Sequence, residues 1–159
     1  MTDASRHPQR QSERQSERQS ERQSERQDSP HEFLNPSSWK AARGYSNAVA
    51  ASGRTLYLGG MIGWNGRQEF ETDDFVEQVA QTLRNIVEVL AEGGAGPQHL
   101  VRLTWYVTDL DEYTARLKEL GAVYREAIGS HYPAMSLVQV VALVEPRAKV
   151  EIEATAVVP

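Results

Sequence analysis

The segment 135–144, with the sequence MSLVQVVALV, limits the possible folds of this chain more than any other segment. If it forms a β-strand, alternate side chains point to opposite faces of a sheet. Both faces would then be mostly apolar, with Met135, Leu137, Val141 and Leu143 on one side and Val138, Val140, Ala142 and Val144 on the other. A strand of this kind predicts a sheet that is covered on both sides.

Two strands and a helix are predicted ahead of this segment. The segments 45–51 and 54–60 have the composition of short strands and are separated by a Ser-Gly dipeptide, which favours a hairpin. A helix follows, with Thr72 as its N-cap and Gly93 just beyond its end. Its apolar stripe consists of Phe75, Val79, Leu83, Ile86, Val87 and Leu90.

The remaining elements complete an α+β pattern. The segment 99–108 is rich in β-branched and aromatic residues and predicts a long strand, after which Asp109 caps a second helix that runs to about Ile128. Strands at 135–144 and 148–157 finish the chain. The order ββαβαββ predicts an α+β domain with two helices on one face of the sheet. Because two helices cover only one face, we expect another subunit to bury the other.

The N-terminal region differs from the rest of the chain. From Gln11 to Arg26 the tetrapeptide Gln-Ser-Glu-Arg occurs four times without an apolar residue. Such a segment cannot bury enough surface to offset the entropy lost on ordering, so residues 1–30 are predicted to be a disordered tail and residues 31–159 the folded domain. A partner-binding arm or a transient helix is the alternative interpretation of the tail.

Composition excludes several classes of function. The six arginines and six acids of residues 1–30 cancel, which leaves 16 acids against 11 bases in the domain. An acidic domain repels polyphosphate, so nucleic-acid binding is disfavoured. The chain has no cysteine, no apolar signal segment and no apolar run of about 20 residues. We therefore expect a cytoplasmic protein that is neither secreted nor embedded in a membrane.

The residues alone suggest little chemistry. The four histidines have no close carboxylate or second histidine in the sequence, so no metal site is expected. Gly59 and Gly60 end a strand, where a ligand could approach the backbone or a bulge could form. Arg102, Thr104 and Tyr106 share one face of their strand, and a solvated face is the simpler interpretation.

A family resemblance covers residues 45 to 158. The stretches YSNAVAASGRTLYLGG, QTLRNIVEVLAEGGAG, VRLTWYVTDL, PAMSLVQVVAL and VEIEATAVV resemble the Rid (YjgF-type) family of reactive-intermediate deaminases, also known as endoribonuclease L-PSP-like proteins. The resemblance implies a chorismate-mutase-like fold and a homotrimer with ligand clefts between subunits. It also implies a cofactor-independent hydrolysis of imines and enamines, such as 2-aminoacrylate, to a keto acid and ammonia.

Three residues of the family's pocket are retained. Tyr45 matches the pocket tyrosine, Gly60 the glycine whose backbone meets the ligand, and Glu151 the glutamate that positions the attacking water. By this resemblance Glu151 is the candidate catalytic base, since a carboxylate can take a proton from water or from an acidic C–H.

Other pocket residues are replaced. Family deaminases hold the substrate carboxylate with the arginine of a Pro-Ala-Arg-Ser motif, where this chain has Met135. Met61 replaces a glutamine, Leu137 a cysteine, and Leu117 or Gly121 falls where the family has an asparagine. Losing a bidentate charged contact costs about 1.5–3 kcal/mol, so carboxylate-bearing imines such as 2-iminopropionate should be poor substrates and a more apolar or neutral ligand should fit better. Either a deaminase-like hydrolase or a non-catalytic metabolite-binding protein is compatible with these residues.

Overall fold

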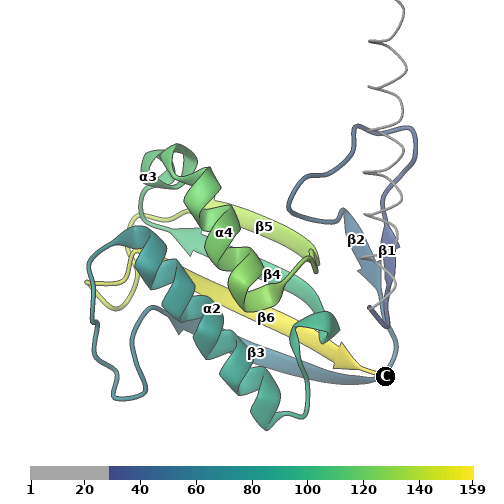
Figure 1. Cartoon of the computed structure of the whole chain (residues 1–159), viewed down its shortest axis with the longest axis horizontal. Coiled ribbons are helices and arrows are strands. Elements are labelled where there is room, and N and C mark those ends of the chain that lie inside the picture. Colours follow the sequence, from purple (N-terminus) through teal and green to yellow (C-terminus); the bar gives the residue numbers. More distant parts are fainter. Residues whose placement is uncertain (1–28) are drawn as a thin grey trace, which may run out of the picture.

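The computed structural model describes residues 29–159. The predicted disordered tail of residues 1–30, with all four of its repeats, therefore lies outside the described residues up to residue 28. A four-stranded sheet carries the helices on one of its faces (Figure 1). The strands are β3 (Arg54–Ile62), β6 (Val150–Val158), β4 (Leu100–Val107) and β5 (Ala134–Gln139), in that spatial order. β4 and β5 are parallel, and the other pairs are antiparallel. The predicted α+β class is confirmed.

The longest helix, α2 (Phe75–Glu92), lies across the sheet as the apolar periodicity predicts. Its N-cap is Asp74, whose carboxylate accepts a hydrogen bond from Glu77 N, and not Thr72 as predicted. The hydroxyl of Thr72 instead accepts from Asp74 N and so supports the cap from outside the helix. The buried residues are Phe75, Val76, Gln78, Val79, Thr82, Leu83, Ile86 and Leu90.

The second predicted helix is divided into two. α3 (Leu110–Ala115) begins at the predicted cap Asp109, and α4 (Leu117–Ile128) follows after Arg116. Arg116 leaves helical geometry (φ −114°, ψ 21°), and its guanidinium forms ion pairs with Asp74 and Glu119. The prediction of one continuous helix was wrong at this residue, because the tertiary ion pair to Asp74 is invisible in local periodicity.

The predicted hairpin of 45–51 with 54–60 does not form. β2 (Ala48–Ala50) pairs antiparallel with β1 (Glu32–Leu34), and this two-stranded unit lies beside the main sheet (Figure 1). β3 pairs with β6 instead. The turn residues at 52–53 reverse the chain, but they do not determine which strand becomes the hydrogen-bonding partner.

The doubly apolar segment is a strand only in its first half. β5 ends at Gln139, and residues 140–149 form a connection that leads into β6. Val141 and Val144 in this connection are fully exposed. The prediction of a strand through residue 144 was therefore wrong. The segment does, however, present apolar side chains that nothing in the described chain covers.

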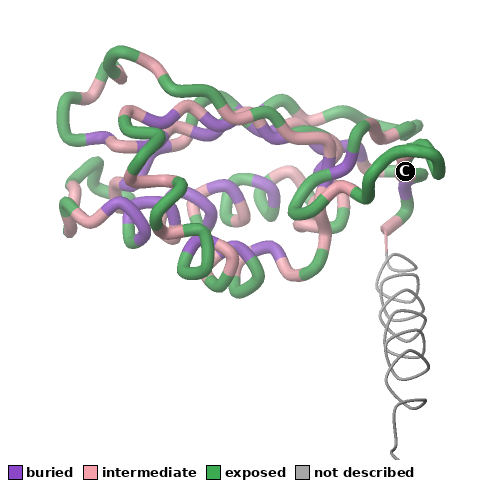
Figure 2. Tube along the Cα trace, turned by 90° about the horizontal axis from the view of Figure 1, so that it is seen from above, coloured by how far each residue is buried: buried purple, intermediate pink, exposed green. Residues whose placement is uncertain are grey.

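The two faces of the sheet differ in burial. In β4, Leu103 and Val107 face the helices and are fully buried, whereas Arg102, Thr104 and Tyr106 lie on the opposite side, as predicted. Figure 2 shows the helices as a layer on one side and much exposed or half-buried chain on the other. We call the side packed on α2 and α4 the covered face, and the opposite side the open face, which includes Tyr57, Arg102, Thr104, Tyr106, Val138, Glu151 and Glu153.

Candidate active site

A cleft of about 370 Å³ opens at the β5 edge of the sheet. Its floor is made by β4 and β5, its wall by α3 and α4, and its rim by the segment 43–45. The lining residues of this edge cleft are Arg43, Gly44, Tyr45, Trp105, Tyr113, Leu117, Leu120, Gly121, Tyr124, Arg125, Tyr132 and Met135. Tyr45 and Met135, which the sequence predicted as ligand contacts, therefore lie in one cleft, together with both helical positions that replace the family's asparagine.

The rim of the edge cleft is fixed by the residue that follows Tyr45. Ser46 N donates to Pro133 O at 3.0 Å, and the Ser46 hydroxyl donates to Tyr132 O at 2.8 Å. Ser46 is buried and forms a parallel bridge with Ala134. These contacts hold Tyr45 beside the start of β5 while leaving the residue 44% exposed.

Aromatic side chains form much of the cleft wall. The rings of Tyr124 and Tyr132 are stacked with centroids 5.3 Å apart, and the Tyr124 hydroxyl donates to His131 O at 2.8 Å. Burial raises the pKa of Tyr124 and of Tyr113 above the usual value of 10. Both phenols therefore stay protonated at neutral pH and add no charge to the wall.

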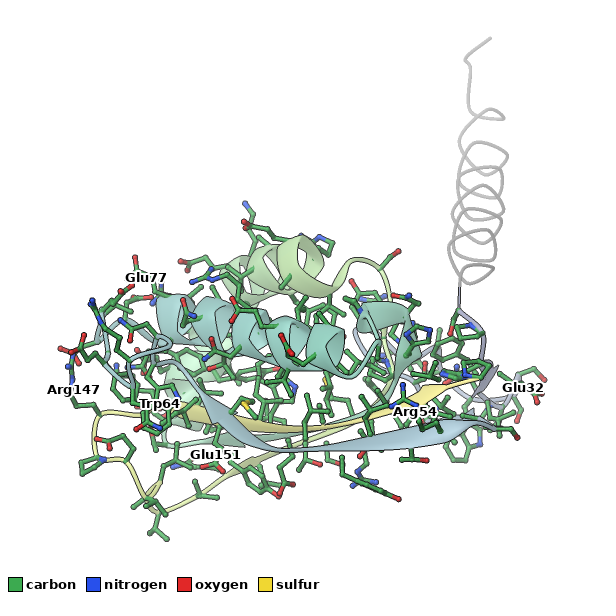
Figure 3. All side chains as sticks on the ribbon, turned by 90° about the horizontal axis from the view of Figure 1, so that it is seen from below. Glu32, Arg54, Trp64, Glu77, Arg147 and Glu151 are labelled. Carbon is green, nitrogen blue, oxygen red and sulfur yellow. The ribbon has the colours of Figure 1, made fainter. Side chains whose placement is uncertain are left out.

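Glu151 and Gly60 form a second group, on the open face. Between Leu58 and Met61 the register with β6 shifts, so Gly59 and Gly60 oppose a single residue of β6, which is a β-bulge. A Cβ at Gly60 would overlap the Glu151 carboxylate, so only glycine allows that carboxylate to lie against the backbone here. Figure 3 shows Glu151 on the side of the sheet away from the helices. A carboxylate beside bulged backbone can bind a water molecule and take its proton.

Tyr106 lies beside Glu151 on the open face and is a hydrogen-bond donor there. Tyr106 pairs with Glu151 across β4 and β6, and its hydroxyl donates to Glu153 Oε2 at 2.9 Å. This hydrogen bond raises the pKa of Tyr106, and the nearby charge of Glu151 raises it further. Tyr106 therefore remains a hydrogen-bond donor next to the two carboxylates.

Not all of the predicted contacts come together within one chain. Met135 lies on the covered face and Glu151 on the open face, so one layer of sheet separates the edge cleft from the Glu151–Gly60 group. Leu137 packs into the core behind Met135 and does not line the cleft. Met61 also packs against the core, but in β3, at the opposite edge of the sheet.

Sequence reasoning did not detect the charge of the edge cleft. The charged residues among its lining are two arginines, Arg43 and Arg125, so the cleft is not uniformly apolar. Arg125 follows Gly121 by four residues on α4, and this spacing places both on one helix face. That signal was available in the sequence, whereas the approach of Arg43 depends on the tertiary position of residues 43–45.

The described region provides no evidence for metal binding or a membrane span. Within residues 29–159 no group of three or more His, Asp or Glu side chains could hold a metal ion. None of the helices in that range is long and apolar enough to cross a membrane.

The fold and clefts define an α+β protein with a mixed sheet, helices on one face and a cleft at one sheet edge. The family model described as Endoribonuclease L-PSP matches residues 36–158. The chain therefore belongs to this family, which confirms the resemblance to Rid (YjgF-type) proteins.

Individual relatives agree with this assignment. The chain is 34% identical over 115 residues to a 2-iminobutanoate/2-iminopropanoate deaminase of Capra hircus, which covers 71% of this chain and 79% of that protein. It is 36% identical over 82 residues to a RutC family protein of Aquifex aeolicus, where the match spans 52% of this chain and 62% of that protein, less than two thirds of its length. A crystal structure of a Rid family protein of unknown function from Yersinia pestis superposes with a TM-score of 0.73 at 34% identity, covering 80% of this chain and 98% of that one.

Proposed function

We propose that this protein is a cofactor-independent imine or enamine hydrolase, and that Glu151 is its general base. The observation that carries the proposal is the contact of the Glu151 carboxylate with the bulged backbone at Gly60. Relatives that carry the name 2-iminobutanoate/2-iminopropanoate deaminase support the same reaction class.

The proposed reaction needs water, one base and a neutral leaving group. Glu151 takes a proton from water as the oxygen adds to the C=N carbon, and passes that proton to the nitrogen to give a carbinolamine. Glu151 then takes the proton of the carbinolamine hydroxyl and delivers it to the nitrogen, so that the C–N bond breaks, the carbonyl forms and ammonia leaves. The products are a carbonyl compound and ammonia, and no electron is transferred to an acceptor. Tyr106 is placed to donate a hydrogen bond near Glu151, because its raised pKa keeps the phenol protonated.

The proposed site is shared between copies of the chain. The edge cleft with Tyr45 and Met135 lies on the covered face, while Glu151 and Gly60 lie on the open face of the same sheet. Groups on opposite faces of one sheet cannot meet around one small ligand. We therefore propose a homotrimer in which the open face of one subunit closes the edge cleft of the next. The exposed Val141 and Val144 support such a contact, since apolar side chains without cover mark interaction surfaces.

Met135 makes small carboxylate imines poor substrates in this proposal. A thioether cannot replace the paired N–H donors with which a guanidinium holds a carboxylate. Turnover of 2-iminopropionate should therefore be about ten to a hundred times slower than that of a relative with the arginine. An equal rate would contradict this part of the proposal.

The test compares two carboxylates of the same strand. 2-Iminopropionate is generated from L-alanine with an amino-acid oxidase, and a neutral imine from benzylamine with a flavin amine oxidase. The measured quantity is the rate of imine loss in competition with semicarbazide. Glu151→Gln should reduce the acceleration of neutral-imine loss by at least about a hundredfold, the usual contribution of a general base.

The control is Glu153→Gln, which changes the charge equally on the same face. Its amide oxygen can still accept the hydrogen bond of Tyr106, so the variant should keep most of the activity. Equal losses in the two variants would contradict the role of Glu151. If the wild-type protein accelerates neither reaction but still binds a ligand in the edge cleft, the protein is a non-catalytic metabolite-binding member of the family.

A further inference from the structure

The edge cleft has a charge opposite to that of the domain. Residues 31–159 carry 16 acids and 11 bases, yet the charged side chains among the residues lining the cleft are Arg43 and Arg125. Neither arginine forms an ion pair with an acid of the described region. Two guanidinium groups that have no ion pair with a described acid, at one concave site, favour an anionic ligand.

A glycine makes room for one of these arginines. A Cβ at Gly121 would lie 3.2 Å from Nη1 of Arg125, so the guanidinium lies over the bare backbone of α4 one turn before its own residue. Gly121 itself lines the edge cleft. Any larger side chain at this position would push the guanidinium aside or fill the cleft.

A buried donor beside the cleft has no acceptor among the described residues. Trp105 lines the edge cleft and is only 4% exposed, and its indole Nε1 has no hydrogen-bond partner among the described residues. Buried donors are nearly always paired, so an unpaired one indicates an acceptor supplied from outside the chain. Because Nε1 is itself shielded from solvent in the single chain, the cleft wall would have to shift on binding to bring a ligand oxygen or a bridging water molecule to it.

The shape and walls of the cleft restrict the rest of the ligand. A volume of about 370 Å³ suits a molecule larger than a three-carbon acid. Tyr45, Tyr113 and the stacked pair Tyr124–Tyr132 offer aromatic surface, and Met135 offers a polarizable thioether that packs well on rings.

We propose that the edge cleft binds an aromatic or similarly bulky apolar acid whose acid group is held by Arg43 and Arg125. This inference rests on the proposed function, because it names the substrate class of the same site. The anion is held from α4 and the segment 43–45, and not from β5, where Met135 provides no positive charge. The acid group therefore lies apart from the reacting C=N carbon, unlike the carboxylate of 2-iminopropionate. In the proposed trimer the open face of the neighbouring copy brings Glu151 and Glu153 together with Arg102, so with Arg43 and Arg125 the arginines still exceed the carboxylates by one charge.

Binding measured by calorimetry on the full chain tests the inference without requiring turnover. The probes are 3-phenylpropionate, its neutral amide 3-phenylpropionamide, and propionate, which keeps the acid group but lacks the ring. The acid with the ring should bind at least about ten times more tightly than either of the others, because one charged hydrogen-bonding contact has about that value. If 3-phenylpropionamide binds as tightly as the acid, or if no probe binds, the inference is overturned.

Matched variants identify the groups responsible. Arg125→Gln and Arg43→Gln should each weaken binding of 3-phenylpropionate about tenfold and leave the amide unaffected. Arg84→Gln removes the same charge from an exposed site on α2 outside the edge cleft and should change neither affinity. If all three variants behave alike, the arginines of the cleft are not the anion site.

The NMR signals of the tryptophan indole N–H groups show where 3-phenylpropionate binds. Of the three tryptophans, only Trp105 lines the edge cleft, so its ¹⁵N-labelled indole N–H signal should shift most on adding 3-phenylpropionate. A shift confined to Trp39 or Trp64 would contradict binding in this cleft. Charge-dependent binding without any imine turnover would support this inference while refuting the hydrolase proposal, so the two failures are distinguishable.

Discussion

The covered face and the open face of the sheet are made by alternate residues of the same strands, and they serve different purposes. On the covered face Leu103 and Ile152 are fully buried under the helices. On the open face the positions next to them along the strands are Thr104 and Glu151, which are only half-buried. The buried face therefore provides the stability of the single chain, while the open face is free to carry chemistry and contacts with other molecules.

Substitution at two adjacent residues of β4 should give the largest difference between the faces. Leu103→Ala removes a fully buried side chain beneath the helices and should lower the free energy of unfolding by about 2–5 kcal/mol. Thr104→Ala, on the open face, should lower it by less than about 1 kcal/mol. Urea denaturation measures both, and equal effects would show that the two faces do not differ as described.

Charges on the exposed valines should break the proposed contact between copies. Val141→Asp combined with Val144→Asp should abolish the trimer, since each valine buried in an interface contributes about 1.5–3 kcal/mol and a buried charge opposes association. The stability of the single chain should hardly change, because both side chains are fully exposed within it. Light scattering after size exclusion gives the mass of the assembly.

The control for this experiment is Val89→Asp, at a partly exposed position on the helix layer. It should leave the assembly intact. Dissociation by Val89→Asp alone, or a trimer that survives both changes in the connection, would mean that subunits meet through a different surface.

An arginine at position 135 on β5 should change which imines the protein hydrolyses. Met135→Arg should raise kcat/KM for 2-iminopropionate about tenfold or more, because a guanidinium can hold the carboxylate with two hydrogen bonds. Met135→Leu keeps an apolar side chain of similar size and should give no increase. An equal increase in both variants would point to altered packing as the cause.

The smallest expected effect is on the pH dependence of stability, through His131. Burial lowers the pKa of His131 below its usual 6.5, and its Nε2 donates to Leu100 O at 2.6 Å. As the pH falls below 6.5, the unfolded chain takes up a proton that the folded chain resists, so stability should decrease. His131→Gln should flatten the dependence of the urea midpoint between about pH 7.5 and 5.5, and an unchanged slope would assign the effect to other groups.

Periodicity predicted the elements whose partners are local or repeated. The apolar stripe of α2, its end before Gly93 and the Asp109 cap of α3 were all visible, because each depends on residues within a few positions. The family resemblance then located Tyr45 and Met135, which the structure places in one cleft.

The remaining features depend on contacts between distant residues. β1 has three residues and shows no period, and its pairing with β2 replaced the expected hairpin. The break at Arg116 coincides with the ion pair of its guanidinium with Asp74, a residue 42 positions away. Arg43 lines the edge cleft because Ser46 holds the segment 43–45 against the start of β5.

In the proposed trimer Glu151 of one copy meets the Tyr45 cleft of another, and chemical cross-linking tests this contact. The chain has no cysteine, so a variant with both Tyr45→Cys and Glu151→Cys carries thiols at these two sites alone. After treatment with a short bismaleimide, we predict covalently linked dimers and trimers on a denaturing gel. Each single variant should remain monomeric, and an equimolar mixture of the two should yield dimers. A double variant that stays monomeric, at a concentration where light scattering reports an oligomer, would contradict the shared site.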